Sequence, residues 1–96
     1  QQALGYTRDV LDLEPLAERW RAFGWDAVEA DGHDVAHLVE HLEGAGRDGD
    51  RPRVVIARTT FGRGISYMEG QIAWHYWPMS DEQYREALSQ LEAATT

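Results

Sequence analysis

The stretch RVVIAR (Arg53–Arg58), followed by TTFGRGISYMEGQIAWHYWP (Thr59–Pro78), decides the fold of this chain. Its first part is a β-branched run, which is typical of a strand covered on both faces. Its second part is a loop with glycines at 62, 64 and 70, where a backbone can turn tightly and approach a ligand closely. The loop ends in His75 among aromatic residues. Since open α/β sheets bind ligands just past the carboxyl ends of their strands, the pattern predicts a ligand-binding loop.

The residues before this strand predict a helix and a second, shorter strand. Asp12 is the expected N-cap of the helix, Pro15 falls in its first turn, and Gly24 ends it. Alternation from Trp25 to Ala30 predicts the short strand. The helix places apolar residues on one face: Leu13, Leu16, Ala17, Trp20 and Phe23.

Two more helices complete the pattern. The turn Asp31–Asp34 opens one of them, and its apolar stripe is Val35, Leu38, Val39 and Leu42. Gly44–Gly46 ends this helix, and Arg47–Pro52 is a polar loop. Ser80–Gln83 matches a capping box at the start of the last helix. Its expected apolar side carries Tyr84, Ala87, Leu88 and Leu91.

Strand, helix and strand in this order predict a right-handed parallel βαβ unit, so the fold class is α/β. Two strands do not make a stable sheet alone, and parallel sheets need both faces covered. We therefore expect residues 1–96 to form the βαβ portion of a larger parallel-sheet domain, incomplete on its own. The alternative is a self-sufficient small α/β domain with a third strand near Leu4–Val10.

Composition excludes several function classes. The 96 residues make at most one small domain, and 17 acidic residues against 9 basic ones, all arginine, give a net charge of −8. This balance disfavours nucleic acids and anionic membrane surfaces as partners. The chain has no cysteine, which excludes disulfides and thiolate metal sites. A cytoplasmic protein fits these features best.

His75 is the first candidate for chemistry. An imidazole in a loop after a glycine-rich turn can donate a proton or a hydrogen bond to a bound anion or hydroxyl. The alternative is a histidine packed among tryptophans. The tryptophans themselves are better explained as core or interface residues, and Glu69 is better explained as a surface carboxylate than as a base.

Two other groups of histidines resemble metal-binding sites. His33 stands near Asp31 and Asp34, but Asp34 is better used in capping the helix that follows. His37 and His41 are one helical turn apart, which allows a metal pair. They lie off the expected apolar stripe and no third ligand is evident, so a solvated face is the favoured interpretation.

Four motifs resemble the thiamine-diphosphate-dependent transketolase family, in particular the N-terminal subunit of split, bacterial-type transketolases. They are LEPLAERWRAFGW (Leu13–Trp25), EADGHD (Glu29–Asp34), VVIARTTFGRGISYMEG (Val54–Gly70) and WHYWPMSDEQY (Trp74–Tyr84). The resemblance covers nearly the whole chain. It implies that residues 1–96 are the C-terminal segment of the diphosphate-binding domain, whose cofactor lies at the carboxyl ends of a parallel sheet.

The resemblance also implies site residues. His75 matches the family histidine beside the cofactor and donor sugar, so it is expected to be catalytic and cofactor-binding. The backbone carbonyl of Gln1 falls at the family's Mg²⁺-binding position. The Asp and Asn metal ligands of the family signature have no match here, so thiamine diphosphate and Mg²⁺ are expected to be held mainly by residues outside this chain. Tyr76 replaces a family glycine, which puts a sugar-phosphate donor in doubt.

The function implied is part of a transketolase-like enzyme that transfers a two-carbon ketol unit from a ketose donor. The chain is expected to be active only within a complete assembly. Its partners would be the remainder of the diphosphate-binding domain and a pyrimidine-binding transketolase subunit, in a dimer or heterotetramer. Two alternatives stay open: a non-catalytic module that completes another subunit, and a subunit that passes the two-carbon unit to a lipoyl or carrier-protein thiol.

Overall fold

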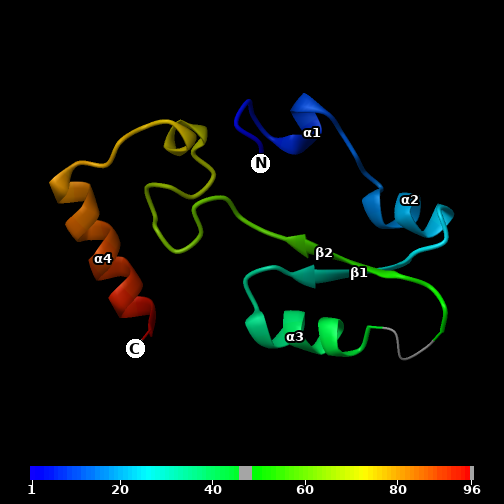
Figure 1. The fold of residues 1–96 in the computed structure, drawn as a ribbon. Helices are drawn as coiled ribbons and strands as arrows, with labels where there is room; N and C mark the ends of the chain where they lie inside the picture. Colours follow the sequence, from blue (N-terminus) through cyan, green and yellow to red (C-terminus); the bar gives the residue numbers. More distant parts are fainter. Residues whose placement is uncertain (46–48, 96) are drawn as a thin grey trace. The chain divides into compact units, whose positions relative to one another are not determined.

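The computed structural model describes residues 1–45 and 49–95, which divide into two compact units (Figure 1). One unit is Leu11–Thr59, and the other combines Gln1–Val10 with Thr60–Thr96. Gly46, Arg47 and Asp48, which the sequence assigns to a helix end and a polar loop, lie outside the described residues, as does Thr96.

The unit Leu11–Thr59 is a βαβ unit, as the sequence predicts. Strands β1 (Asp26–Asp31) and β2 (Arg53–Arg58) pair in parallel, with Asp26 opposite Arg53 and Asp31 opposite Arg58. Helix α3 (Val35–Glu43) makes the crossover between them and contacts both strands (Figure 1). The predicted bounds of β2 are confirmed. Strand β1 begins one residue later than predicted, because the Trp25 N–H donates to the carbonyl of Trp20 at the end of the preceding helix.

Helix α2 (Leu16–Ala22) starts later than the sequence predicts. Asp12 is not its N-cap: the Asp12 carboxylate accepts from the Glu14 N–H at 3.0 Å. The first free helical N–H, that of Leu16, instead donates to the Glu14 carboxylate at 3.0 Å. Gly24 ends the helix as predicted, with a left-handed φ of +88° that suits glycine.

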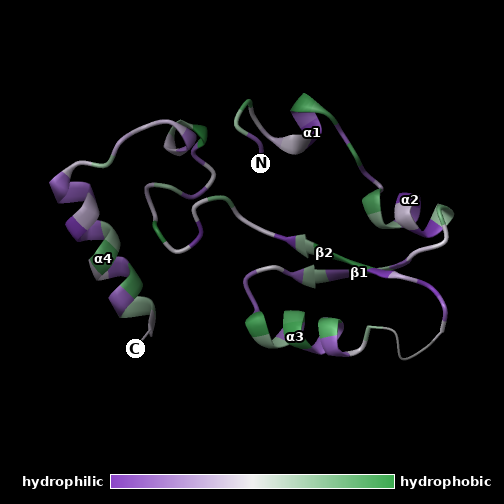
Figure 2. Cartoon of the chain, viewed as in Figure 1, coloured by the Kyte–Doolittle hydropathy of each residue, from purple (hydrophilic) through white to green (hydrophobic). Residues whose placement is uncertain are grey.

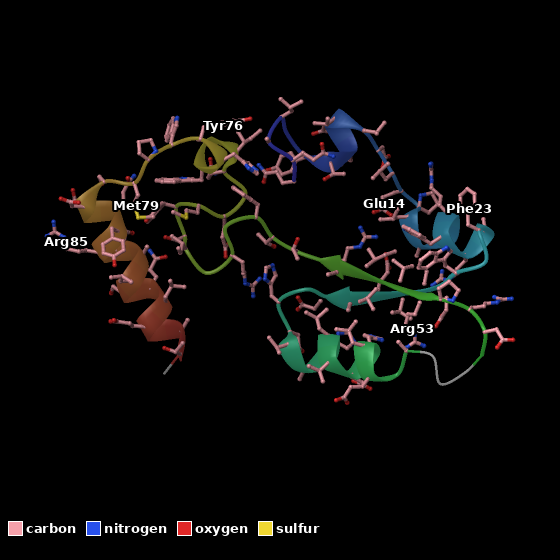
Figure 3. The ribbon with its side chains drawn as sticks, in the orientation of Figure 1. Glu14, Phe23, Arg53, Tyr76, Met79 and Arg85 are labelled. Atoms are coloured by element: carbon pink, nitrogen blue, oxygen red, sulfur yellow. The ribbon has the colours of Figure 1, made fainter. Side chains whose placement is uncertain are left out.

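The core of this unit is small. Ala17 of α2, Ala27 of β1 and Ile56 of β2 are buried together, and Leu16, Trp20 and Val54 pack against them. Phe23, expected on the buried face of α2, is 86% exposed and projects from the end of the helix (Figure 3). The buried side chains are short because one helix and two strands enclose little volume.

The predicted apolar stripe of α3 is largely exposed in this unit. Val35, Val39 and Leu42 are exposed, whereas Leu38 and the pair His37 and His41 are half-buried. The two histidines are therefore more covered than the expected solvated face would leave them, although solvent still reaches them. Adjacent strands lie only about 5 Å apart, against a helix diameter of about 10 Å, so a two-stranded sheet covers one narrow side of the helix. Figure 2 shows hydrophobic positions recurring along α3.

The second unit contains α1 (Thr7–Val10), the 3₁₀ helix η1 (Ile72–His75) and α4 (Asp81–Thr95). The alternative interpretation, a third strand near Leu4–Val10, is wrong: Gln2 pairs with Gly5 in a single bridge, and α1 follows. A bridge that closes within four residues leaves no extended segment long enough to pair with a sheet.

The start of α4 is the predicted capping box. The Gln83 N–H donates to Ser80 Oγ at 3.1 Å, and the Ser80 N–H donates to Gln83 Oε1 at 3.0 Å. Along the predicted apolar side, Ala87 is buried, whereas the larger residues Tyr84, Leu88 and Leu91 are exposed.

No helix in the described parts of the chain combines the length and apolar character needed to cross a bilayer.

Candidate active-site loop

The segment 60–78 folds back on itself through glycine turns. The Gly70 N–H donates to the carbonyl of Phe61 at 2.9 Å, which closes the loop at its base. Gly62 has a φ of +72°, and a Cβ there would lie 2.6 Å from the carbonyl carbon and oxygen of Met68. Only glycine fits this position without displacing the backbone. The sequence expectation of a tightly turned glycine loop is confirmed.

Side chains inside the loop hold it to itself and to α4. Glu69 Oε1 accepts from the Gly64 N–H at 3.1 Å, so this carboxylate supports the turn. The Ser66 N–H donates to Gln90 Oε1 at 2.7 Å, and the Tyr67 hydroxyl donates to the Gln83 carbonyl at 2.6 Å. Burial, with a smaller contribution from the Glu86 charge, raises the pKa of Tyr67. The loop is therefore anchored along much of its length.

The aromatic residues near the loop end divide into half-buried rings that support the loop and exposed rings. The Trp74 indole N–H donates to the Tyr67 carbonyl at 3.0 Å, and its ring is half-buried against the Tyr67 and Trp77 rings. Tyr76 and Trp77 are 67% and 66% exposed. The Tyr76 hydroxyl donates to the Ala3 carbonyl at 3.1 Å, which fixes the exposed Tyr76 ring (Figure 3).

His75 is the exposed last residue of η1. Its imidazole lies flat on the Phe61 ring, with centroids 4.2 Å apart and planes 11° from parallel. The Tyr76 ring lies next to it at a centroid distance of 6.2 Å. Within the described part of the chain, no hydrogen bond reaches the His75 ring nitrogens. The imidazole is thus positioned by stacking, with both nitrogens available to a ligand.

The contact between Phe61 and His75 was not foreseen from sequence. The two residues are fourteen positions apart in sequence, and the glycine turns bring them together. The sequence offers one signal of this contact. An aromatic residue stands directly before Gly62-Arg63-Gly64, and a histidine stands at the other end of the same loop.

The other predicted site residues lie elsewhere. Asp34 is the N-cap of α3 and accepts from the His37 N–H at 3.1 Å, and Asp31 accepts from the His33 N–H at 2.9 Å. No group of three His, Asp or Glu side chains suited to a metal occurs in residues 1–45 or 49–95. Gln1 is half-buried, and the expectation for its carbonyl stays a prediction.

The strongest charge cluster lies in the other unit, at the end of β2. The Arg58 guanidinium donates to Glu14 at 2.5 Å and 3.2 Å and also to Glu29. The hydrogen bonds from Arg58, and then that from the Leu16 N–H, lower the pKa of Glu14 to about 2. The two carboxylates in turn raise the pKa of Arg58. Arg58 pairs with both carboxylates, and all three side chains are exposed. This ion-pair cluster is a structural clamp between β2, the other strand and the residues before α2.

Comparison with known proteins agrees with this architecture. The family model described as the thiamine diphosphate binding domain of transketolase matches residues 5–94. A 6-deoxy-6-sulfo-D-fructose transketolase subunit of Clostridium sp. (strain MSTE9) is 38% identical over 88 residues, which are 92% of this chain and 32% of that protein. An apulose-4-phosphate transketolase subunit of Actinobacillus succinogenes is 40% identical over 91 residues, which are 95% of this chain and 33% of that protein.

More distant transketolases match as well. The transketolase of Rattus norvegicus is 36% identical over 85 residues, which are 84% of this chain and 13% of that protein. The chain thus spans about a third of the length of the similar transketolase subunits, and less of the longer transketolases.

A parallel βαβ unit followed along the chain by a glycine-turned loop is the element order of part of an α/β domain. This chain belongs to the transketolase family and lies within its thiamine diphosphate binding domain. The predicted fold class, the βαβ portion of a parallel-sheet thiamine-diphosphate-binding domain, is confirmed.

Proposed function

We propose that this chain is part of a transketolase-like enzyme that moves a two-carbon ketol unit from a ketose donor to an acceptor. One observation carries the proposal: His75, in the family-matching segment, presents an exposed imidazole that is fixed by a parallel stack on Phe61. No described residue makes a hydrogen bond to either ring nitrogen, so both can serve a ligand. Such a group can hold a donor hydroxyl and exchange a proton with it.

The stack determines what His75 can do. A ring pinned face-on to Phe61 keeps its edge, which carries the two nitrogens, at the open side of the contact. A hydroxyl approaching in the ring plane can therefore accept a hydrogen bond from one nitrogen or donate to it. Fixing the imidazole before the substrate arrives reduces the entropy lost on binding, which favours catalysis by orientation.

The described residues fit the cofactor only in part. When bound, thiamine diphosphate supplies the electron sink for carbon–carbon cleavage. His75 is suited to the donor sugar beside the cofactor, and the carbonyl of Gln1 is proposed as one Mg²⁺ ligand. Because the described residues contain no cluster of three metal-ligating side chains, we propose that the diphosphate and Mg²⁺ are held mainly by other residues of the complete enzyme.

The donor we propose is a ketose with an anionic end group. The similar subunits are named for an apulose 4-phosphate and for a sulfonated deoxyfructose, which are both sugars with a terminal anion. Tyr76 stands where the family usually has glycine, and its ring is held by the Ala3 carbonyl next to His75. We propose that this bulk narrows the space around the imidazole and makes the usual sugar-phosphate donors less suitable than the unusual ketoses for which the similar subunits are named.

A cytoplasmic assembly of at least two kinds of subunit is the setting we propose. The similar proteins are named as transketolase subunits, which implies further subunits for them. For this chain, the proposed partners are the remainder of the diphosphate-binding domain and a pyrimidine-binding subunit, in a dimer or heterotetramer. Exposed Leu4, Tyr76 and Trp77 offer apolar surface for such contacts.

The experiment is a transfer assay with the assembled enzyme. Phosphorylated and sulfonated ketoses are supplied with an aldose acceptor, with and without thiamine diphosphate and Mg²⁺. We expect an aldose two carbons shorter than the donor and a ketose two carbons longer than the acceptor, only when the cofactor is present. An assembled complex that binds the cofactor yet transfers no two-carbon unit from any donor would contradict the proposal.

A further inference from the structure

Helix α3 carries a pair of histidines that the proposed function does not use. His37 and His41 are one turn apart, and their Nε2 atoms are 3.0 Å from each other. The ring centroids are 4.6 Å apart and the planes are inclined by 52°. Both side chains are half-buried, so the two nitrogens meet at a site that solvent still reaches.

The separation of the two nitrogens matches that of two ligands on one metal ion. Imidazole nitrogens bind late first-row divalent ions at about 2.0–2.1 Å. With a right angle at the metal the two nitrogens lie about 2.9 Å apart, and with a tetrahedral angle about 3.3 Å. The observed 3.0 Å is close to the right-angled value. Neighbouring positions of square-planar or octahedral coordination are typical of Cu²⁺ and Ni²⁺.

We propose that His37 and His41 form a two-histidine chelate for a late divalent transition ion of the Cu²⁺ and Ni²⁺ class. Water fills the remaining positions, because no third metal-ligating side chain joins the pair within the described residues. In the metal-free protein, one imidazole donates its Nε2 hydrogen to the other. On binding, that ring moves its hydrogen to Nδ1, so both rings stay neutral and both Nε2 lone pairs reach the metal.

Neighbouring residues hold the two histidines in place and offset the nearby positive charge of Arg53. Arg53 of β2 donates to the His41 carbonyl at 3.1 Å and to the Asp26 carboxylate at 2.7 Å (Figure 3). The Asp26 carboxylate offsets the guanidinium charge that would otherwise repel a cation. The Asp34 carboxylate caps the helix by accepting from the His37 N–H. A side chain thus holds the backbone of each histidine in the pair. The chelate is thus assembled only when α3 is folded.

The test is a titration of the assembled protein with Ni²⁺, measured by calorimetry. Saturating Mg²⁺ and thiamine diphosphate are present throughout, which occupies any cofactor site that Ni²⁺ could enter. We expect one saturable Ni²⁺ per chain, lost in His37→Gln and in His41→Gln. His33→Gln is the matched control, because His33 lies in the preceding turn, and it should keep the binding. Absent saturable binding, or binding that survives both replacements in the pair, would overturn the proposal.

A second measurement needs no variant and covers the case in which one fails to fold. Electron paramagnetic resonance of the wild-type protein with one equivalent of Cu²⁺ should show coupling to two imidazole nitrogens. Ni²⁺ should also raise the melting temperature, since it binds the folded helix in preference to the unfolded chain. A spectrum with one imidazole nitrogen or none would contradict the chelate.

Discussion

At the scale of single residues, the His75 ring is held by stacking on Phe61, whereas its aromatic neighbours are held by hydrogen bonds. The Trp74 indole N–H and the Tyr67 hydroxyl donate to backbone carbonyls, whereas no described residue bonds to the His75 ring nitrogens and its ring lies on the Phe61 face. Aromatic stacking fixes the ring without occupying the atoms that act on substrate. Phe61 is therefore a positioning residue in our account, and His75 the group that touches substrate.

Replacing Phe61 by leucine tests this positioning. We expect turnover of the assembled enzyme to fall about threefold to tenfold, since an aromatic pair is worth about 0.5–1.5 kcal/mol beyond its buried area. Phe61→Tyr retains the stack and should restore most of the rate. Steady-state kinetics at several pH values provides the measurement. Phe23→Leu, at an exposed phenylalanine, is the control. Equal rates for the wild type and Phe61→Leu would rule out a role for the stack.

Gly62→Ala tests the turn beneath the stack. The φ of +72° and the contact with the Met68 carbonyl should together cost about 1–3 kcal/mol. Gly24→Ala, where φ is +88° but no atom lies within 4 Å of the added Cβ, should cost less. Urea unfolding of both variants measures the difference. A Gly62→Ala protein as stable as Gly24→Ala would mean that the loop has room at this point.

At the scale of elements, the sequence predicts the strands and the caps of α3 and α4 better than it predicts the cap of α2 or the buried faces of the helices. The β-branched run Arg53–Arg58 and the capping box at Ser80 depend on neighbours in sequence, and both are confirmed. The side of α3 that is buried depends on how wide a sheet lies beneath it, which periodicity does not encode. That is why Val35 is exposed and His37 is half-buried. The Phe61 stack escaped prediction for a similar reason, because it requires the loop to close.

The clamp between Glu14 and Arg58 ties the start of α2 to the end of β2 and should be visible in a titration. The pKa of Glu14 in the folded protein, about 2, is below the ordinary value of 4.5. The clamp therefore stabilises the fold fully above pH 4.5. That contribution is lost as pH falls through about 2. Carboxyl NMR should show a Glu14 midpoint near 2, which rises in Arg58→Met and in high salt. A wild-type midpoint near 4.5 would mean that the pair is open in solution.

At the scale of the whole molecule, apolar surface exceeds what the described residues bury. Buried positions are mostly alanines, whereas Leu4, Phe23 and Val35 are 80%, 86% and 73% exposed. Since parallel sheets occur almost only with both faces covered, this surface is expected to be covered in the assembled enzyme. From the sequence, two strands alone predict that this chain is an incomplete part of a larger sheet domain. The exposed apolar side chains agree with that prediction.

The 96-residue chain by itself should not bind thiamine diphosphate measurably. It contributes His75 and one proposed carbonyl, but no cluster of metal-ligating side chains among its described residues. Calorimetric titration with thiamine diphosphate in the presence of Mg²⁺ is the measurement, with the assembled enzyme as the positive control. Micromolar binding by the chain alone would show that the cofactor site is complete within it.

The most direct test of the whole account is the turnover of the assembled enzyme carrying His75→Ala. We predict a loss of about 10²-fold or more in kcat, the range for removal of a general acid or base, with an unchanged melting temperature. His33→Ala, at a histidine outside the loop, should leave kcat as it is. An unchanged kcat together with a sharply lower melting temperature would contradict the account, because His75 would then be a packing residue.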